Sequence, residues 1–302
     1  MKRLVLLSFF VGFTQLAIGQ AAIRRTAIEK PAFDTKSSID WIDMEIRAQT
    51  ALNLASANIK LPGGRVRAQE LVEGEYLHLI RPVILNIQVD SSHTVADLLS
   101  GRELNLADIG RLSRPVSKTP PALSKDMGFM QVSYTVSLKA MSEALLRHSR
   151  PSTIRRPLSP VKAPAYTGII IIATGNLPIH GRNTTSRVQP CIFPKIWDTD
   201  MNLIYERSMT DPDKNKNGIV KYVPEEAVFR PTPSGMDEDL EAFIGKNPLR
   251  ILARGVFGMN PTDLIIDRSD ALLILSSDEN VNLLRYSRVA FALDPSALNA
   301  SL

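Results

Sequence analysis

Residues Gly168–Ala173 read Gly-Ile-Ile-Ile-Ile-Ala, and this run decides the fold of the C-terminal half. Its isoleucines leave no polar position on either side of the chain. Such a run is typical of a strand that is buried on both faces of a sheet and covered by helices. We therefore expect this strand to belong to the central sheet of a mixed α/β domain that spans residues 165–295.

Other short apolar runs follow this strand and predict the rest of the sheet. They cover residues 191–197, 202–205, 219–223, 249–253, 264–266 and 288–293. The residues between them predict helices over 235–244, 269–275 and 281–284. Ser234 or Asp237 is expected to cap the first helix, and Gly245 is expected to end it. Residues 296–302 are expected to form a short tail.

The preceding region, residues 38–146, predicts a helix-rich α+β domain. From Ile39 to Ile59, apolar and small side chains recur at helical spacing, which predicts an amphipathic helix. The sequence Leu61-Pro62-Gly63-Gly64 then gives a strong stop signal. The whole chain is therefore expected to have an α+β fold in two domains.

The rest of this first domain shows helical periodicity in some stretches and strand periodicity in another. A second helical pattern starts near Arg65 and is interrupted at Pro82, and short helices are expected over 95–99 and 140–146. Residues 129–138 alternate between apolar and polar side chains, which predicts a strand with one buried face.

The segment 147–164 joins the two domains and differs from both in composition. It holds four prolines and five basic residues but no acid, which predicts an extended, semi-rigid linker. A basic run of this kind favours either contact with an acidic partner, such as an envelope glycan, a lipid head group or an acidic protein, or simple solvation. The candidate contact residues are Arg150, Arg155, Arg156 and Lys162.

The N-terminus predicts export. Lys2 and Arg3 precede the apolar run 4–13, and Ala17-Ile18-Gly19 provides the small residues that a signal peptidase reads. The run is too short to span a bilayer, so residues 1–19 are expected to be a signal peptide cleaved before Gln20. Residues 20–37 are expected to be a flexible lead-in. The mature chain is then periplasmic, without a transmembrane segment, and nucleic acid is not an expected partner.

The composition is that of a globular protein, with 44% hydrophobic and 22% charged residues. The sequence lacks the phosphate-binding, dinucleotide-binding, serine-hydrolase and zinc-protease motifs. Its four histidines are scattered, and the single cysteine, Cys191, is expected to be a buried hydrophobic residue. We therefore expect no catalytic residue, cofactor or metal site, and a hydrolase of unrecognised type is the weakest alternative.

Two acidic motifs deserve an interpretation. Residues Asp213–Gly218 match the first half of a calcium-binding loop, but position twelve is Pro224 in place of the bidentate acid that calcium requires. Asn and Gly also favour plain turns, which is the preferred interpretation. Asp198 and Asp200, with Glu206 nearby, could form a carboxylate pair, but they lie between two apolar runs, where a hairpin turn is expected.

The C-terminal half contains a series of short segments in a characteristic order: Tyr166–Ile171, Phe193–Asp198, Leu203–Tyr205, Gly245–Ile251, Thr262–Ile266, Asp270-Ala271 and Arg288–Asp294. In the order of these segments it resembles domains of bacterial envelope proteins related to the flagellar lipoprotein FlgP. The N-terminal half is similar to the same class more loosely. This chain departs from those lipoproteins because it has no cysteine for a lipid anchor near the cleavage point.

The resemblance implies a non-catalytic envelope protein that is structural or acts in assembly, in some members tied to flagella or their motors. Other envelope or flagellar proteins are then the expected partners, and self-association into a homo-oligomer is open. The alternative is a periplasmic binding module for an envelope ligand such as peptidoglycan.

The family-like glycines and acids have structural interpretations. Gly168, Gly245 and Gly255 are expected to allow close packing or a positive φ. Asp263 and Asp270 are expected at caps or turns.

Overall fold

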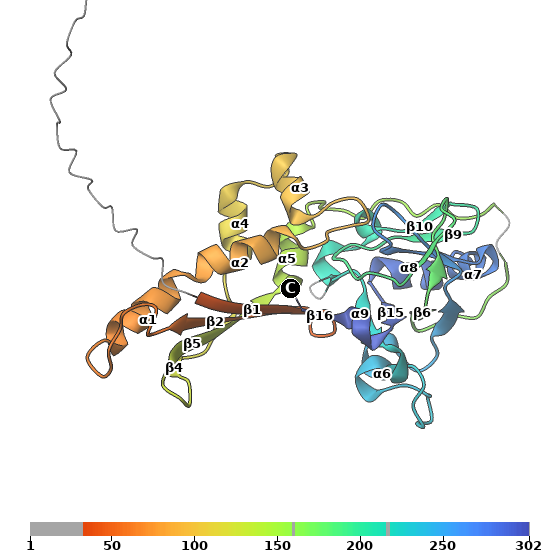
Figure 1. The fold of residues 1–302 in the computed structure, drawn as a ribbon. Helices are drawn as coiled ribbons and strands as arrows, with labels where there is room; N and C mark the ends of the chain where they lie inside the picture. The colour runs from red at the N-terminus through yellow and green to blue at the C-terminus, as the bar shows by residue number, and fades with distance from the viewer. Residues whose placement is uncertain (1–32, 159–160, 216–217, 302) are drawn as a thin grey trace, which may run out of the picture. The chain divides into compact units, whose positions relative to one another are not determined.

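The computed structural model describes residues 33–158, 161–215 and 218–301. The predicted signal peptide and the first part of the lead-in, residues 20–32, lie outside the described residues. The described elements mix helices, an antiparallel sheet and a parallel sheet, so the predicted α+β fold is confirmed (Figure 1). Within these ranges, no helix is both long and apolar enough to cross a membrane.

The N-terminal half is built on one antiparallel sheet in the order β16-β1-β2-β5-β3, with β4 paired to β5. Helices α1, α2 and α5 lie against one face of this sheet (Figure 1). The strands are β1 (Phe33–Asp40), β2 (Glu45–Asn53), β3 (Ser117–Lys118), β4 (Ala122–Leu123), β5 (Phe129–Ser137) and β16 (Asn299–Ser301).

The predicted helix from Ile39 to Ile59 is wrong, because this stretch forms most of the β1–β2 hairpin. In β2, Ile46 and Leu52 are fully buried and face the same side as their partners in β5. Their even spacing is the period of a strand, and the pairing with β5 decides between the two patterns. The strand β1 also begins at Phe33, inside the predicted lead-in.

The helical part of this half follows the predicted order, with one helix that was not predicted. Pro82 lies inside α2, and the capping boxes Thr94–Asp97 and Asn105–Asp108 start α3 and α4. The unpredicted helix is α4, which is only seven residues long. The helices are α1 (Arg65–Gly74), α2 (Tyr76–Leu85), α3 (Val95–Ser100), α4 (Leu106–Leu112) and α5 (Leu138–Leu145).

The C-terminal half contains two four-stranded sheets, where the sequence predicted one central sheet. The parallel sheet has the order β11-β15-β6-β12, and every residue of β6 is buried, as expected of the isoleucine run. The parallel strands are β6 (Ile169–Ala173), β11 (Lys221–Pro224), β12 (Leu249–Leu252) and β15 (Val289–Leu293). The second sheet consists of β10 (Leu203–Tyr205), β9 (Ile196–Asp198), β14 (Asp263–Ile266) and β13 (Gly255–Phe257).

The remaining elements of this half are short. The helices are α6 (Glu238–Ile244), α7 (Arg268–Ile274), α8 (Asp278–Arg285) and α9 (Pro295–Leu298), and β7 (Leu177–Pro178) pairs with β8 (Thr185–Ser186). Asp237 caps α6 by accepting a hydrogen bond from the Asp239 amide at 3.0 Å, and Gly245 ends it at a φ of +83°. Both predictions are confirmed.

Asp263 is placed differently from the prediction. It lies inside β14, fully buried, and its carboxylate accepts hydrogen bonds from the Lys195 amide and the Trp197 indole, each at 3.2 Å. Burial raises the pKa of this carboxyl. Asp263 therefore joins β14 to Trp197 in β9 and to Lys195 directly before β9. It neither caps a helix nor forms a turn.

The two halves share backbone hydrogen bonds and one hydrophobic core. The predicted tail is wrong: β16 pairs with β1 at three positions, and the Trp41 amide bonds the Leu298 carbonyl at 3.0 Å. A second junction joins the Phe193 amide to the Val89 carbonyl at 2.7 Å. The chain from Pro31 onward is accordingly one compact unit.

The described part of segment 147–164 contains no helix or strand, as expected of its prolines. It is nonetheless held along its length. Ile154 is buried, and the Ser152 amide bonds the Ser208 carbonyl at 2.7 Å. Arg156 pairs with Asp278 at 2.7 Å. Residues 152–156 of the segment are therefore fixed against the C-terminal half.

Candidate functional site: an arginine groove beside helix α4

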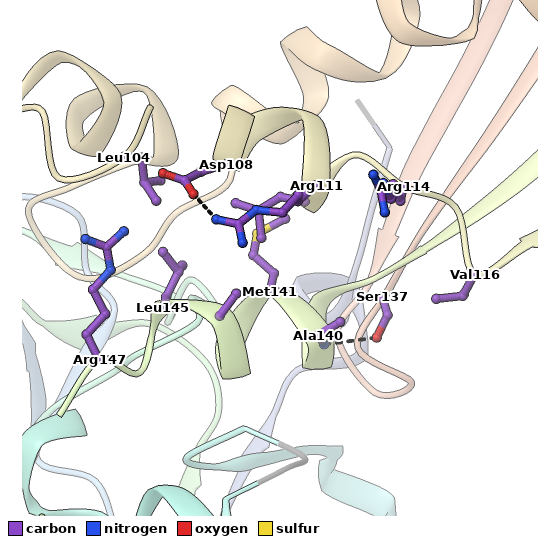
Figure 2. A pocket seen from close by; sticks show the side chains of 12 residues that line it. Leu104, Asp108, Arg111, Arg114, Val116, Ser137, Ala140, Met141, Leu145 and Arg147 are labelled. Carbon is purple, nitrogen blue, oxygen red and sulfur yellow. Dashed lines mark hydrogen bonds and ion pairs between the residues drawn. The ribbon is translucent and has the colours of Figure 1, made fainter. Parts of the chain in front are cut away.

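A cavity of about 520 Å³ opens between α4 and α5. Figure 2 shows apolar side chains of α5 projecting toward α4, with Arg111 between the two helices. The capping box of α4 and the Ser137 cap of α5, whose hydroxyl accepts from the Ala140 amide at 3.2 Å, fix where the two helices begin. The apolar lining consists of Leu104, Leu112, Val116, Ala140, Met141, Ala144 and Leu145.

Three arginines from separate positions in the chain surround this apolar floor. Arg111 comes from α4, Arg114 follows it, and Arg147 follows α5 (Figure 2). All three side chains are exposed at the mouth. The lining contains one carboxylate, Asp108, which pairs with Arg111. The cavity is therefore apolar inside and positive around its rim.

Asp108 holds the start of α4 and one of these arginines in place. Its carboxylate accepts a hydrogen bond from the Asn105 amide at 2.9 Å, and this bond is the main reason that the pKa of Asp108 lies below its ordinary value. The hydrogen bond from Arg111 and the charges of Arg111 and Arg147 lower the pKa further. The carboxylate thus stays ionised and orients Arg111.

A prediction follows from this lowered pKa. A group with a depressed folded-state pKa stabilises the fold above its unfolded pKa, near pH 4, and this contribution is lost as the pH falls. We expect Asp108→Asn to lower stability at pH 7 and to flatten the loss of stability between pH 5 and about pH 3. Urea unfolding midpoints of the natural protein and the variant at pH 7, pH 5 and about pH 3 measure this. A variant whose stability falls with pH as steeply as that of the natural protein contradicts the prediction.

A second cavity of about 220 Å³ continues the first. The two cavities share Leu104, Leu145 and Arg147, and the second adds Glu103 and Arg207. Arg207 also lies over the ring of Phe193, with its guanidinium carbon 5.4 Å from the ring centroid. We call the two cavities together the arginine groove, with Arg111, Arg114, Arg147 and Arg207 along it.

The chemistry of the groove favours binding. Guanidinium groups hold carboxylates through paired hydrogen bonds, and an apolar floor takes an apolar side chain at the same time. Two of its polar side chains have structural hydrogen bonds: Ser137 caps α5, and His148 Nε2 donates to the Thr210 carbonyl at 2.8 Å. The ligand that fits is an anionic group attached to an apolar body.

Comparison with protein families gives two matches. Residues 32–144 match the N-terminal domain of Treponema pallidum Tp0624, and residues 168–295 match its second domain. The chain is similar to Tp0624 over two successive domains. No curated protein sequence matches the chain. The resemblance to FlgP-type lipoproteins stays a prediction, since neither match refers to them.

The groove draws on both regions similar to Tp0624. Arg111 and Arg114 lie in the N-terminal match, Arg207 lies in the second, and Arg147 lies in the stretch between them. The sequence offered a weak signal for it, namely basic residues next to apolar ones around 104–116 and 140–147. The groove was not predicted because only the fold brings these stretches together.

The predicted contact residues of segment 147–164 lie outside the groove. Arg150, Arg155 and Lys162 are exposed, and none of them forms an ion pair within the described residues. Arg156 is engaged with Asp278 and with the Ser276 carbonyl at 3.0 Å. Three of the four predicted residues are therefore available to a partner from solution.

The acidic motifs behave as turns where the structure describes them. Asp198 accepts hydrogen bonds from the Asp200 and Asn202 amides at 3.0 and 2.8 Å, which confirms the hairpin turn between β9 and β10. Of Asp213–Gly218, residues 216 and 217 lie outside the described residues. Elsewhere in the described chain, no group of three or more His, Cys, Asp or Glu side chains is arranged to hold a metal.

Cys191 is fully buried, as predicted, and burial raises the pKa of its thiol well above the ordinary value. Its amide and carbonyl both bond the Tyr222 hydroxyl, at 3.1 and 2.8 Å. We expect the native protein to resist a thiol-reactive dye that requires the thiolate, and the denatured protein to react fully. The amount of coloured product that the thiol releases from the reagent, compared between buffer and denaturant, measures this. Rapid reaction of the folded chain contradicts it.

Proposed function

We propose that the protein is a non-catalytic component of the bacterial envelope that works by binding other proteins during assembly. The observation that supports this most directly is the arginine groove, whose rim is positive and whose floor is apolar. Arginines around an apolar pocket are common anchors of protein–protein interfaces. The groove suits an acidic segment of a partner that also carries an apolar side chain.

The envelope and flagellar parts of the proposal rest on the sequence. The N-terminal nineteen residues resemble a signal peptide, and the C-terminal half resembles FlgP-related proteins. Periplasmic location follows from the first, and association with a flagellum or its motor follows from the second. A deletion strain with normal motility and normal flagella contradicts the flagellar part and leaves the binding part standing.

Co-purification tests the binding function. The protein is tagged and recovered from solubilised envelopes after cross-linking, in its natural form and as the variant R111Q/R114Q/R147Q. The matched control is R65Q/R67Q/R81Q, because these three arginines are also exposed and lie on α1 and α2, away from the groove.

We expect the groove variant to lose specific partners that the control variant retains. Glutamine replaces arginine without reversing charge, so Asp108 is not placed beside a new carboxylate. Equal recovery of partners by the natural protein and the groove variant contradicts the proposal. Melting curves of both variants show whether either change disturbs the fold.

The alternative is a binding module for peptidoglycan. The observation in its favour is that Arg150, Arg155 and Lys162 are exposed without ion pairs in the described part of the chain. Retention on purified sacculi tests this, with R150Q/R155Q/K162Q as the variant. Binding that this variant loses and the groove variant keeps favours the alternative over assembly.

A further inference from the structure

The C-terminal half carries a surface whose charge is opposite to that of the groove. Glu225 and Glu226 lie in the short 3-10 helix Glu225–Ala227, and Glu238 and Asp239 lie in the first turn of α6. The Asp237 amide bonds the Ala227 carbonyl at 2.8 Å, which brings the two acidic stretches side by side. We call these four carboxylates the acidic patch.

The acidic patch is open to solvent and has an apolar neighbour. Glu226, Glu238 and Asp239 are exposed, and none of the four carboxylates forms an ion pair within the described residues. Phe229, three residues beyond Glu226, is 61% exposed, so its ring is accessible to a partner.

The positive groups beside the patch do not cancel its charge. Lys221 lies 5.4 Å from the Phe243 ring centroid, and its Nζ donates to the Asp239 carbonyl at 3.5 Å. Arg230 follows Phe229 and is exposed. Lys139, Lys221 and Arg230 line one cavity together with Asp237 and Asp239. The four carboxylates of the patch and Asp237 therefore outnumber these three cations, and the surface stays negative.

The groove presents the reverse arrangement. Four arginines line it, against the carboxylates of Asp108 and Glu103, and its floor is apolar. A negative surface with an exposed aromatic side chain complements a positive cavity with an apolar floor in both charge and hydrophobicity. The first cavity, about 520 Å³, has room for a phenylalanine side chain.

We propose that the acidic patch of one copy, with Phe229, binds the arginine groove of a second copy. This rests on the proposed assembly function and adds that the partner is the protein itself. Because the two surfaces are different parts of one chain, the contact is heterologous. Each bound pair leaves one groove and one patch free, so the contact repeats as a closed ring or an open row.

Sedimentation of the full mature protein tests the proposal through two complementary variants. The groove variant R111Q/R114Q/R147Q keeps the patch, and the patch variant E226Q/E238Q/D239Q keeps the groove. We expect the natural protein to self-associate in low salt and to dissociate as salt is raised, because the contact is between opposite charges. Each variant alone is expected to be monomeric, with association weakened at least about tenfold.

Mixing the two variants is the decisive step. The patch of the first and the groove of the second are intact, so the mixture is expected to form one-to-one pairs that cannot extend. Phe229→Ser, which leaves every charge in place, is expected to weaken association of the natural protein in low salt. The control R65Q/R67Q/R81Q is expected to associate like the natural protein.

Three results overturn the proposal: a natural protein that is monomeric at high concentration in low salt, variants that associate as well as it does, or a mixture that forms no pairs. If self-association is absent while the groove variant still loses envelope partners, the groove serves a different protein, and the proposed function survives without the second copy.

Discussion

Removal of residues 295–302 is expected to produce the largest loss of stability of any change considered, roughly 5 kcal/mol. The deleted stretch contains α9 and β16. Leu298 is fully buried, and loss of such a leucine costs about 2–5 kcal/mol. The three paired positions between β16 and β1 add backbone hydrogen bonds worth about 1 kcal/mol each. Trp41 also loses its bond to the Leu298 carbonyl.

Urea unfolding followed by tryptophan fluorescence measures this effect, since Trp41 lies at the junction and packs edge-on against Tyr222 with ring centroids 5.7 Å apart. Leu298→Ala is the matched partial change and should give about half the loss. A truncated chain with the midpoint of the natural protein contradicts the account, because the C-terminal strand then adds nothing to the N-terminal sheet.

Gly168→Val is expected to have the second largest effect, a loss of about 3 kcal/mol or failure to fold. A Cβ atom at Gly168 would lie 2.7 Å from the Cγ2 atom and from the carbonyl oxygen of Ile244. Gly168 directly precedes β6, and Ile244 ends α6, so neither backbone can move without disturbing the parallel sheet.

Gly74→Ala provides the control, because a Cβ atom at Gly74 meets nothing within 4 Å and alanine favours the helix that contains it. Its stability should be unchanged or slightly raised. Thermal and urea unfolding of both variants measure the difference. A folded Gly168→Val protein with an unchanged midpoint would show that the helix does not pack this closely on the strand.

In the C-terminal half, strand β6 and the ends of α6 could be predicted because their local signals agree with their tertiary environment. Every residue of β6 is apolar in sequence and buried in the structure. Asp237 and Gly245 mark the ends of α6 through capping and a positive φ, which depend on neighbouring residues alone. Such signals are readable without knowledge of the fold.

The N-terminal hairpin could not be predicted in the same way. Ile39, Ile46 and the alanines between and after them fit a helical period and a strand period about equally well. The pairing of β2 with β5, more than seventy residues later in the chain, decides the outcome. β16 gave no signal at all, since Asn299–Ser301 becomes a strand only because β1 is there to pair with it.

The arginine groove shows the same limit. Arg111 and Arg147 are far apart in sequence and meet only because α4 packs beside α5. The sequence directed attention instead to the basic run of segment 147–164, with Arg150, Arg155, Arg156 and Lys162, whose side chains are exposed and spread along the segment. Arg147 belongs to both, as the first residue of that run and as part of the groove.

The most direct test of the account is photo-cross-linking in living cells from position 144. Ala144 is exposed and lines the groove, so a photoreactive amino acid placed there lies within reach of any bound segment. Met127, 63% exposed in the loop between β4 and β5 and absent from the lining of the groove, is the control position. We predict cross-linked adducts from position 144 that disappear in R111Q/R114Q/R147Q and are absent from position 127. No adduct at position 144, or adducts that persist without the three arginines, would contradict the claim that this groove binds a protein partner.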